Sequence, residues 1–210
     1  TIALQNLLKE DPMPRIVDRE ERRRSIADAV FRVIGREGMD AVSLRDVAAE
    51  ADLSMGSIQH YFSTKDEMLL FALNHMRARV ITRFEAKLAR MKNPSKRQYL
   101  RTMLNMLLPT DDESRQEATV NISFFASSVN NEQFRELLRQ GYAGLLVAIE
   151  LQLQAAADAG ELREGMDSKT EAAQIFYTAQ GLIGPVLLGV TTPRRAVALL
   201  DAHLDRIFRD

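Results

Sequence analysis

The chain has 210 residues, of which 46% are apolar and 27% are charged. This is enough to bury a core in one domain or in two closely packed domains. The composition therefore excludes a chain that is intrinsically disordered as a whole. The 28 basic residues nearly balance the 29 acidic residues, so any binding to nucleic acid or to an anionic membrane has to be local. The absence of cysteine excludes disulfides, Cys-ligated zinc and a thiol nucleophile, and is compatible with a reducing cytoplasm.

The first part of the chain is expected to contain a tail and three helices. The apolar residues of segment 1–18 are interrupted by polar ones, which leaves no signal-peptide core, so this segment is predicted to be a tail. From Arg19 the pattern is helical, with apolar residues three and four apart up to a stop at Gly38. Two short helices follow, and Ser43 and Ser54 are placed to cap them.

A long helix is predicted next, and the domain boundary is placed inside it. Thr64 and Glu67 have the spacing of a capping box, which opens a helix that continues to about Met91. The boundary is expected near Ala78. The predicted organisation is therefore a tail over 1–18, one domain over 19–77 and a second domain over 78–210.

The second domain is predicted to be helical throughout. Helices are expected over 96–108, 112–129, a stripe from Phe134 to Leu153, 169–190 and 193–208. The uncharged run 172–193 has roughly the length of a membrane span. Polar residues, glycines and a proline interrupt it, which favours a helix buried in protein and predicts no membrane partner. The predicted fold class is all-α.

Charge is uneven along the chain. Residues 77–101 carry nine basic side chains and one acidic one, and residues 102–210 carry 9 basic and 15 acidic ones. Solvated helix faces explain both segments, with a binding role as the alternative. Residues 15–76 carry 9 basic and 11 acidic side chains, so this part of the chain has no overall positive field.

The segment from Val42 to Met68 is the most informative one. Two short capped helices joined by the turn Asp52-Leu53-Ser54 fit a helix-turn-helix, whose second helix enters the major groove of DNA. The residues that carry a family resemblance here are Ser43, Arg45, Val47, Ala48, Ser54, Gly56, Phe62 and Lys65. In these residues the segment resembles the N-terminal domain of the tetracycline-repressor (TetR) family of bacterial transcription regulators, and the resemblance covers about residues 19–75.

The sequence departs from the family pattern at two positions. Asp52 stands where the family usually has glycine in the turn, and Asp tolerates the left-handed backbone that this position requires. Gln59 stands where the family usually has tyrosine, and its amide can pair with adenine. The predicted DNA-binding residues are Ser43, Arg45, Ser54, Met55, Gly56, Ser57, Gln59, His60, Tyr61 and Lys65. The arginines at 22–24, with Arg15 and Arg19, are expected to add phosphate contacts or to form an exposed helix face.

The resemblance also implies a role for the second domain. In this family the later helices enclose a small-molecule pocket, and the last two helices form a four-helix interface in a dimer. The candidates for the ligand pocket are Met103, Met106, Leu107, Phe124, Phe125, Ser128, Tyr142, Phe176, Tyr177 and Gln180, with plain core packing as the alternative for each. The candidates for the dimer interface are Leu182, Ile183, Val186, Leu187, Val190, Val197, Leu200, Leu204, Ile207 and Phe208.

No catalytic constellation is present in the sequence. The three histidines are scattered, and neither a phosphate-binding loop nor a nucleophile motif occurs. We therefore predict no enzyme activity, no metal and no cofactor. The predicted function is that of a cytoplasmic, homodimeric transcriptional regulator, a repressor that binds a palindromic operator and is released by an apolar or aromatic effector. An organic cation is the alternative effector, and an all-helical adaptor that no longer binds DNA is the alternative function.

Overall fold

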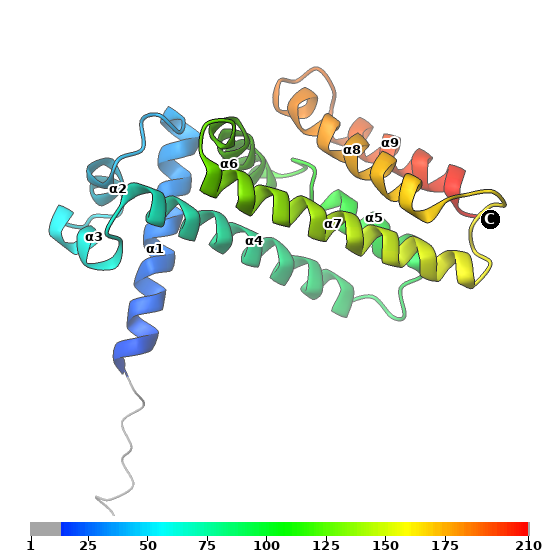
Figure 1. Ribbon diagram of the computed structural model, residues 1–210, viewed down its shortest axis with the longest axis horizontal. Helices are drawn as coiled ribbons and strands as arrows, with labels where there is room; N and C mark the ends of the chain where they lie inside the picture. The colour runs from blue at the N-terminus through cyan, green and yellow to red at the C-terminus, as the bar shows by residue number, and fades with distance from the viewer. Residues whose placement is uncertain (1–13, 210) are drawn as a thin grey trace, which may run out of the picture. The chain divides into compact units, whose positions relative to one another are not determined.

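The computed structural model describes the backbone of residues 14–209 and the side chains of residues 19–209 (Figure 1). Over this range the chain forms nine helices, and its one β-type pairing is an isolated bridge between Leu162 and Phe208. The helices are α1 (Pro14–Glu37), α2 (Leu44–Glu50), α3 (Met55–Tyr61), α4 (Lys65–Ala89), α5 (Lys96–Asn105), α6 (Asp112–Ser128), α7 (Glu132–Asp158), α8 (Ser168–Leu187) and α9 (Pro193–Ile207). The all-α prediction is confirmed.

The first helix begins earlier than the sequence pattern indicated. Residues 14–18, which the sequence pattern assigns to the tail, belong to α1. The helix begins at Pro14, and proline suits the first helical position because its fixed φ is already helical and its missing N–H has no partner there. The rest of the predicted tail lies outside the described residues.

The chain divides into two compact units, one ending at His75 and the other starting at Met76. The division falls inside α4, as does the boundary expected from the sequence. The capping of α4 differs slightly from the predicted box. Thr64 Oγ1 accepts from the Glu67 amide at 3.1 Å, and the Glu67 carboxylate accepts from the Ser63 amide at 2.8 Å.

The first unit is built on the apolar stripe of α1. Ile26, Val30, Val33 and Ile34 are buried, and α1 packs against both α2 and α3. Glu50 on α2 ties the two helices together on the outside, since Arg32 Nε and Arg36 Nη1 donate to its carboxylate at 2.6 Å and 2.7 Å. These hydrogen bonds hold the pKa of Glu50 below its usual value.

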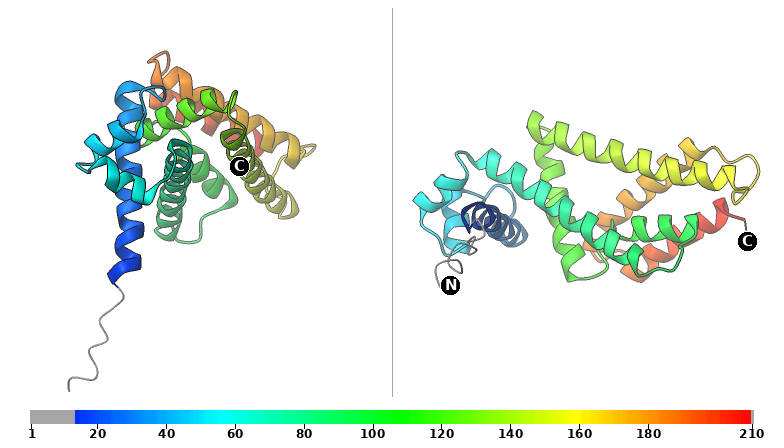
Figure 2. Two further views of the ribbon diagram at one scale, coloured as in Figure 1. Left: turned by 60° about the vertical axis from the view of Figure 1, so that its left-hand side comes forward. Right: turned by 90° about the horizontal axis from the view of Figure 1, so that it is seen from below.

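The second unit is organised around α7, which packs against α5, α6 and α8. Figures 1 and 2 show α7 running along α8, and α8 lying beside α9. The stripe on α8 that includes Ala172, Ile175, Phe176 and Ala179 is buried in this core. Burial in protein therefore accounts for the inward side of the uncharged run, whereas Tyr177, Leu188 and Val190 in the same run are exposed. Among the described residues, none of the helices is long and apolar enough to cross a membrane.

The last helix corrects part of the dimer prediction. Leu200, Leu204, Ile207 and Phe208 are buried in the core of their own chain. These four candidates for the dimer interface are therefore covered by other residues of their own chain. Ile183 and Val186 on α8 are also buried, whereas Leu182, Leu187 and Val197 are partly exposed and Val190 is exposed.

Several basic residues of the run 77–101 form ion pairs with acidic residues of the later helices in the second unit. Arg79 Nη2 on α4 lies 2.6 Å from Glu113 on α6, and Arg83 binds Glu117 on the same helix. Arg101 on α5 binds Asp201 on α9 with two hydrogen bonds of 2.5 Å and 2.9 Å. The basic run and the acidic segments therefore neutralise each other across neighbouring helices.

Candidate functional site

Two serine caps define the helix-turn-helix of the first unit. Ser43 Oγ accepts from the Asp46 amide at 3.2 Å and starts α2, and Ser54 Oγ accepts from the Ser57 amide at 3.1 Å and starts α3. Both hydroxyls have a second partner as well, the carboxylate of Asp46 for Ser43 and the hydroxyl of Ser57 for Ser54. These two predicted DNA-binding residues thus also position the helices.

The turn between the two helices depends on Asp52. Its φ is +54°, a left-handed backbone that an L-residue with a short polar side chain adopts most readily. The Leu53 amide donates back to the Ala48 carbonyl at 2.9 Å and closes the turn. Asp52 therefore replaces the usual glycine without changing the motif, as the sequence predicted.

Replacing Asp52 with valine should destabilise the first unit by about 1–2 kcal/mol, because a β-branched side chain is strained at positive φ. Asp52→Gly should cost less than about 0.5 kcal/mol. The measurement is urea unfolding followed by circular dichroism. Asp40→Val is the matched control, since Asp40 is also exposed and has no positive φ. Equal losses in Asp52→Val and Asp40→Val would contradict the assigned strain.

Helix α3 presents an uncharged polar face to solvent. Gln59 and His60 are exposed and Tyr61 is partly exposed, while Ile58 is buried beneath them. The rings of His60 and Tyr61 pack edge to face with centroids 5.2 Å apart. An open groove runs beside this face and is lined by Arg22, Leu53, Ser54, Gly56, Ser57, His60 and Tyr61.

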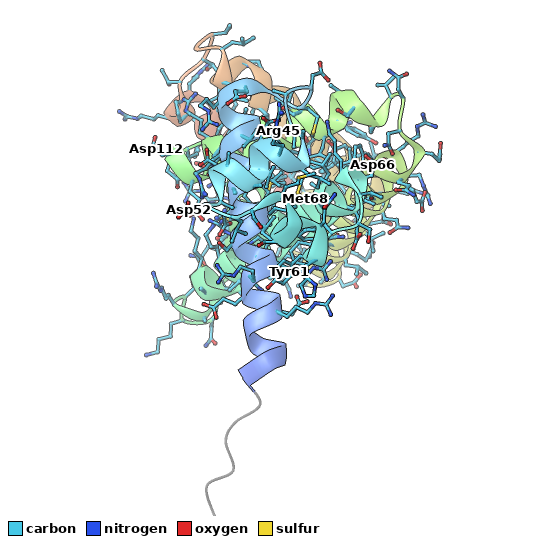
Figure 3. All side chains as sticks on the ribbon, turned by 90° about the vertical axis from the view of Figure 1, so that its left-hand side faces the viewer. Arg45, Asp52, Tyr61, Asp66, Met68 and Asp112 are labelled. Atoms are coloured by element: carbon cyan, nitrogen blue, oxygen red, sulfur yellow. The ribbon has the colours of Figure 1, made fainter. Side chains whose placement is uncertain are left out.

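The basic residues around α3 divide into free and occupied side chains. Arg45 (labelled with Tyr61 in Figure 3) is exposed, and within the described part of the chain Arg45, Lys65 and Arg22 have no ion pair. Arg23 is turned inward, with its guanidinium 4.8 Å from the centroid of Phe62 and an ion pair to Glu67 at 3.8 Å. It is therefore a packing residue. The side chain of Arg15 lies outside the described residues.

The second unit contains a cavity of about 410 Å³ between its helices. The residues that line it come from α4, from α6 to α8 and from the end of α5: Met76, Arg77, Val80, Ile81, Met106, Leu107, Ser114, Glu117, Ala118, Asn121, Gln140, Gly141, Tyr142, Gly144, Leu145, Gln180 and Ile183. This volume is within the range of small-molecule sites, and the lining combines apolar walls with a few polar groups.

Four of the predicted pocket residues line this cavity: Met106, Leu107, Tyr142 and Gln180. The other six do not. Met103, Phe124 and Phe176 are buried in the core, and Ser128 is buried at the end of α6. Phe125 and Tyr177 point outward, with 54% and 59% of their surface exposed. Helical spacing identified the helices involved but did not distinguish a wall of the cavity from the neighbouring core or surface.

Several cavity residues were missed by the sequence analysis. Arg77 is the most notable, since it was counted only as part of the basic run. It lies on α4 beside Met76 and is followed one turn later by Val80 and Ile81. A single charge within an apolar stripe is a signal that points to a cavity rather than to a solvated face.

The geometry defines a class of protein: one unit carries a helix-turn-helix whose second helix has an exposed polar face, and a helical second unit contains a ligand-sized cavity. Residues 26–71 match the family described as bacterial regulatory proteins, tetR family, and residues 96–209 match the BetI-type transcriptional repressor C-terminal domain. The chain belongs to the TetR family. It is a transcriptional regulator and not an enzyme, as the sequence predicted.

The relatives cover between 81% and 91% of the chain. The HTH-type transcriptional regulator PksA of Bacillus subtilis is 32% identical over 170 residues, which is 81% of this chain and 80% of PksA. The regulator BetI of Brucella anthropi is 25% identical over 91% of this chain and 96% of its own length. A putative transcriptional regulator from Saccharomonospora viridis, solved in complex with choline, is 25% identical, has a TM-score of 0.82, and covers 91% of this chain and 100% of its own.

Proposed function

We propose that this chain is a homodimeric repressor that binds a palindromic DNA operator and releases it when a small molecule occupies the cavity of the second unit. The observation that carries the proposal is the exposed polar face of α3, flanked by free basic side chains, in a chain that belongs to a family of transcriptional regulators. In this proposal α3 lies in the major groove, and Gln59, His60 and Tyr61 read base edges. The protein would act in the cytoplasm.

The proposed dimer uses a different surface from the one first expected. The outward face of α8 carries Tyr177 and Gly181. Leu188, directly after the last residue of α8, and Leu199 on α9 are also exposed. Leu188 has 81% of its surface exposed, which leaves a large apolar side chain without cover in the single chain. A four-helix contact between the α8–α9 pairs of two copies would bury this face.

Arg45→Ala and Lys65→Ala should each flatten the dependence of DNA affinity on salt by about one unit of slope, because each removes one phosphate contact. The measurement is fluorescence anisotropy with a labelled operator over a series of salt concentrations. Arg115→Ala on α6 is the control, since it removes an exposed charge from the other unit. Slopes that stay the same in both variants would remove these residues from the interface.

Release of the operator by an effector is tested with two successive measurements. Compounds are first screened by thermal shift, and the operator affinity is then measured with each compound that stabilises the protein. The relative solved with choline shows that a protein of similar fold and 25% identity holds an organic molecule. A hundredfold release of DNA requires about 2.7 kcal/mol of coupling between the sites. If every stabilising compound leaves operator affinity unchanged, the proposed release mechanism is wrong.

A further inference from the structure

We propose that the cavity of the second unit takes a ligand with an apolar body and a carboxylate head group, and that the guanidinium of Arg77 is the anchor for that carboxylate. The proposal rests on the proposed effector function of this cavity and adds the chemical class of the ligand. It is carried by three features of the cavity: the unpaired cation at Arg77, the neutralised acid at Glu117 and the missing side chain at Gly141.

Arg77 is a partly buried cation with no acid beside it. Its Nη2 donates to the carbonyl of Leu137 at 2.9 Å, and among the described residues no carboxylate pairs with it. Burial lowers the pKa of Arg77, yet an arginine stays protonated at neutral pH. Placing a charge in a half-buried site without a counter-ion is unfavourable. Most of the five N–H donors of this guanidinium remain available to an anion.

The one carboxylate among the lining residues is already neutralised. Arg83 donates to both oxygens of Glu117, at 2.7 Å and 2.5 Å, so this acid has little capacity left for a cationic ligand. Tyr142 is the one aromatic residue in the lining, which is fewer than the several rings of an aromatic cage for an ammonium group. The charge balance of the cavity therefore favours an anion over an organic cation.

Gly141 on α7 leaves the space in which the guanidinium lies. A Cβ built at this glycine would overlap Nη2 and Cζ of Arg77, so any side chain here would push the guanidinium aside. Gly144, one turn further along the same helix, also lines the cavity, and a Cβ built there meets nothing within 4 Å. The two glycines therefore form a matched pair: substitution at the first displaces the anchor, and substitution at the second does not.

The remaining walls suit an apolar body. Val80 from α4, Leu107 after α5, Leu145 from α7 and Ile183 from α8 contribute aliphatic surface to the cavity. The volume of about 410 Å³ accommodates a chain of roughly ten carbons or a substituted aromatic ring. A carboxylate at one end of such a molecule can accept two parallel hydrogen bonds from a guanidinium, which a lysine ammonium does not provide.

The test uses three probes with the same ten-carbon chain: decanoate, decanol and decyltrimethylammonium. Binding to the full-length protein without DNA is measured by calorimetry. Decanoate should bind at least about tenfold more tightly than the other two, because the free energy of one hydrogen bond to a charged group corresponds to at least that change in affinity. Arg77→Met should remove this preference and leave decanol binding within about threefold. Gly141→Ala should reduce the preference for decanoate over decanol, and Gly144→Ala, which leaves the guanidinium of Arg77 in place, should keep that preference.

Four results would overturn the proposal: equal affinity for decanoate and decanol, tightest binding of the cation, full decanoate affinity in Arg77→Met, or no binding of any probe at millimolar concentration. If Arg77→Met does not fold, as judged by circular dichroism, the comparison of Gly141→Ala with Gly144→Ala tests the proposal in its place. Because these measurements contain no DNA, they are independent of effector release. Decanoate that binds through Arg77 without releasing an operator would leave this inference standing and would contradict the proposed function.

Discussion

Replacing Leu204 with arginine should unfold the second unit, whereas replacing Leu188 with arginine should leave it folded and separate the dimer. Leu204 is fully buried in the core beside Leu200 and Ile207, so an arginine there places an unpaired charge among apolar side chains. The expected loss is more than about 4 kcal/mol. Leu188 is exposed, so arginine there should change the intrinsic stability of the protomer by no more than about 0.5 kcal/mol.

Sedimentation and circular dichroism distinguish the two variants. Leu188→Arg should sediment as a folded monomer at micromolar concentration, where the unsubstituted protein should be a dimer. Leu204→Arg should lose helical signal or aggregate. A Leu204→Arg variant that is folded and monomeric would restore the original expectation that the apolar stripe of α9 is an interface. An unsubstituted protein that is monomeric at this concentration would defeat the dimer itself.

Gln59→Ala and Tyr61→Ala should each weaken specific DNA binding by about 1–3 kcal/mol, which is roughly 5-fold to 150-fold, because each removes a contact to a base edge. The first unit should remain folded, since neither side chain is buried in its core. Binding to a non-specific duplex should change much less, because phosphate contacts dominate that affinity. The measurement is anisotropy with specific and unrelated duplexes.

The control for these two variants is Asn74→Ala, which removes an exposed amide from α4 in the same unit. It should leave both affinities unchanged. If Gln59→Ala and Tyr61→Ala also bind the specific duplex as tightly as the unsubstituted protein, then α3 does not read the bases as proposed. If binding to both duplexes is weakened by the same factor, the two residues contact the phosphate backbone instead of the bases.

The first unit was predictable because its signals are local. Ser43 and Ser54 cap helices that begin one residue later, and Asp52 tolerates the positive φ that the turn requires. Each of these properties depends on a few neighbouring residues, which a sequence displays directly. The position of Arg23 was not predictable in this way, because its stacking on Phe62 and Phe71 depends on how α1 packs against the later helices.

The second unit was harder to predict because its pattern identifies a buried face without identifying what covers that face. The stripe of Leu200, Leu204 and Ile207 is equally compatible with a core and with an interface, and the structure places it in the core. The same limit applies to the cavity, because Phe124 and Phe176 are apolar and on the expected helices but pack into the core. Arg77 was missed since a charge on a long helix is usually solvated.

Selection of bound sequences from random duplex DNA tests the central claim most directly. One recovered motif shows both whether the protein recognises a specific DNA sequence and whether that sequence has two-fold symmetry. A symmetric pair of α3 helices predicts a palindrome with half-sites centred about 34 Å apart, one turn of the duplex, or a multiple of that spacing. The Gln59→Ala variant should relax the preference at one base position in each half-site. Enrichment of no sequence, or of a motif without two-fold symmetry, would contradict the account and favour a helical protein that no longer reads DNA as a dimer.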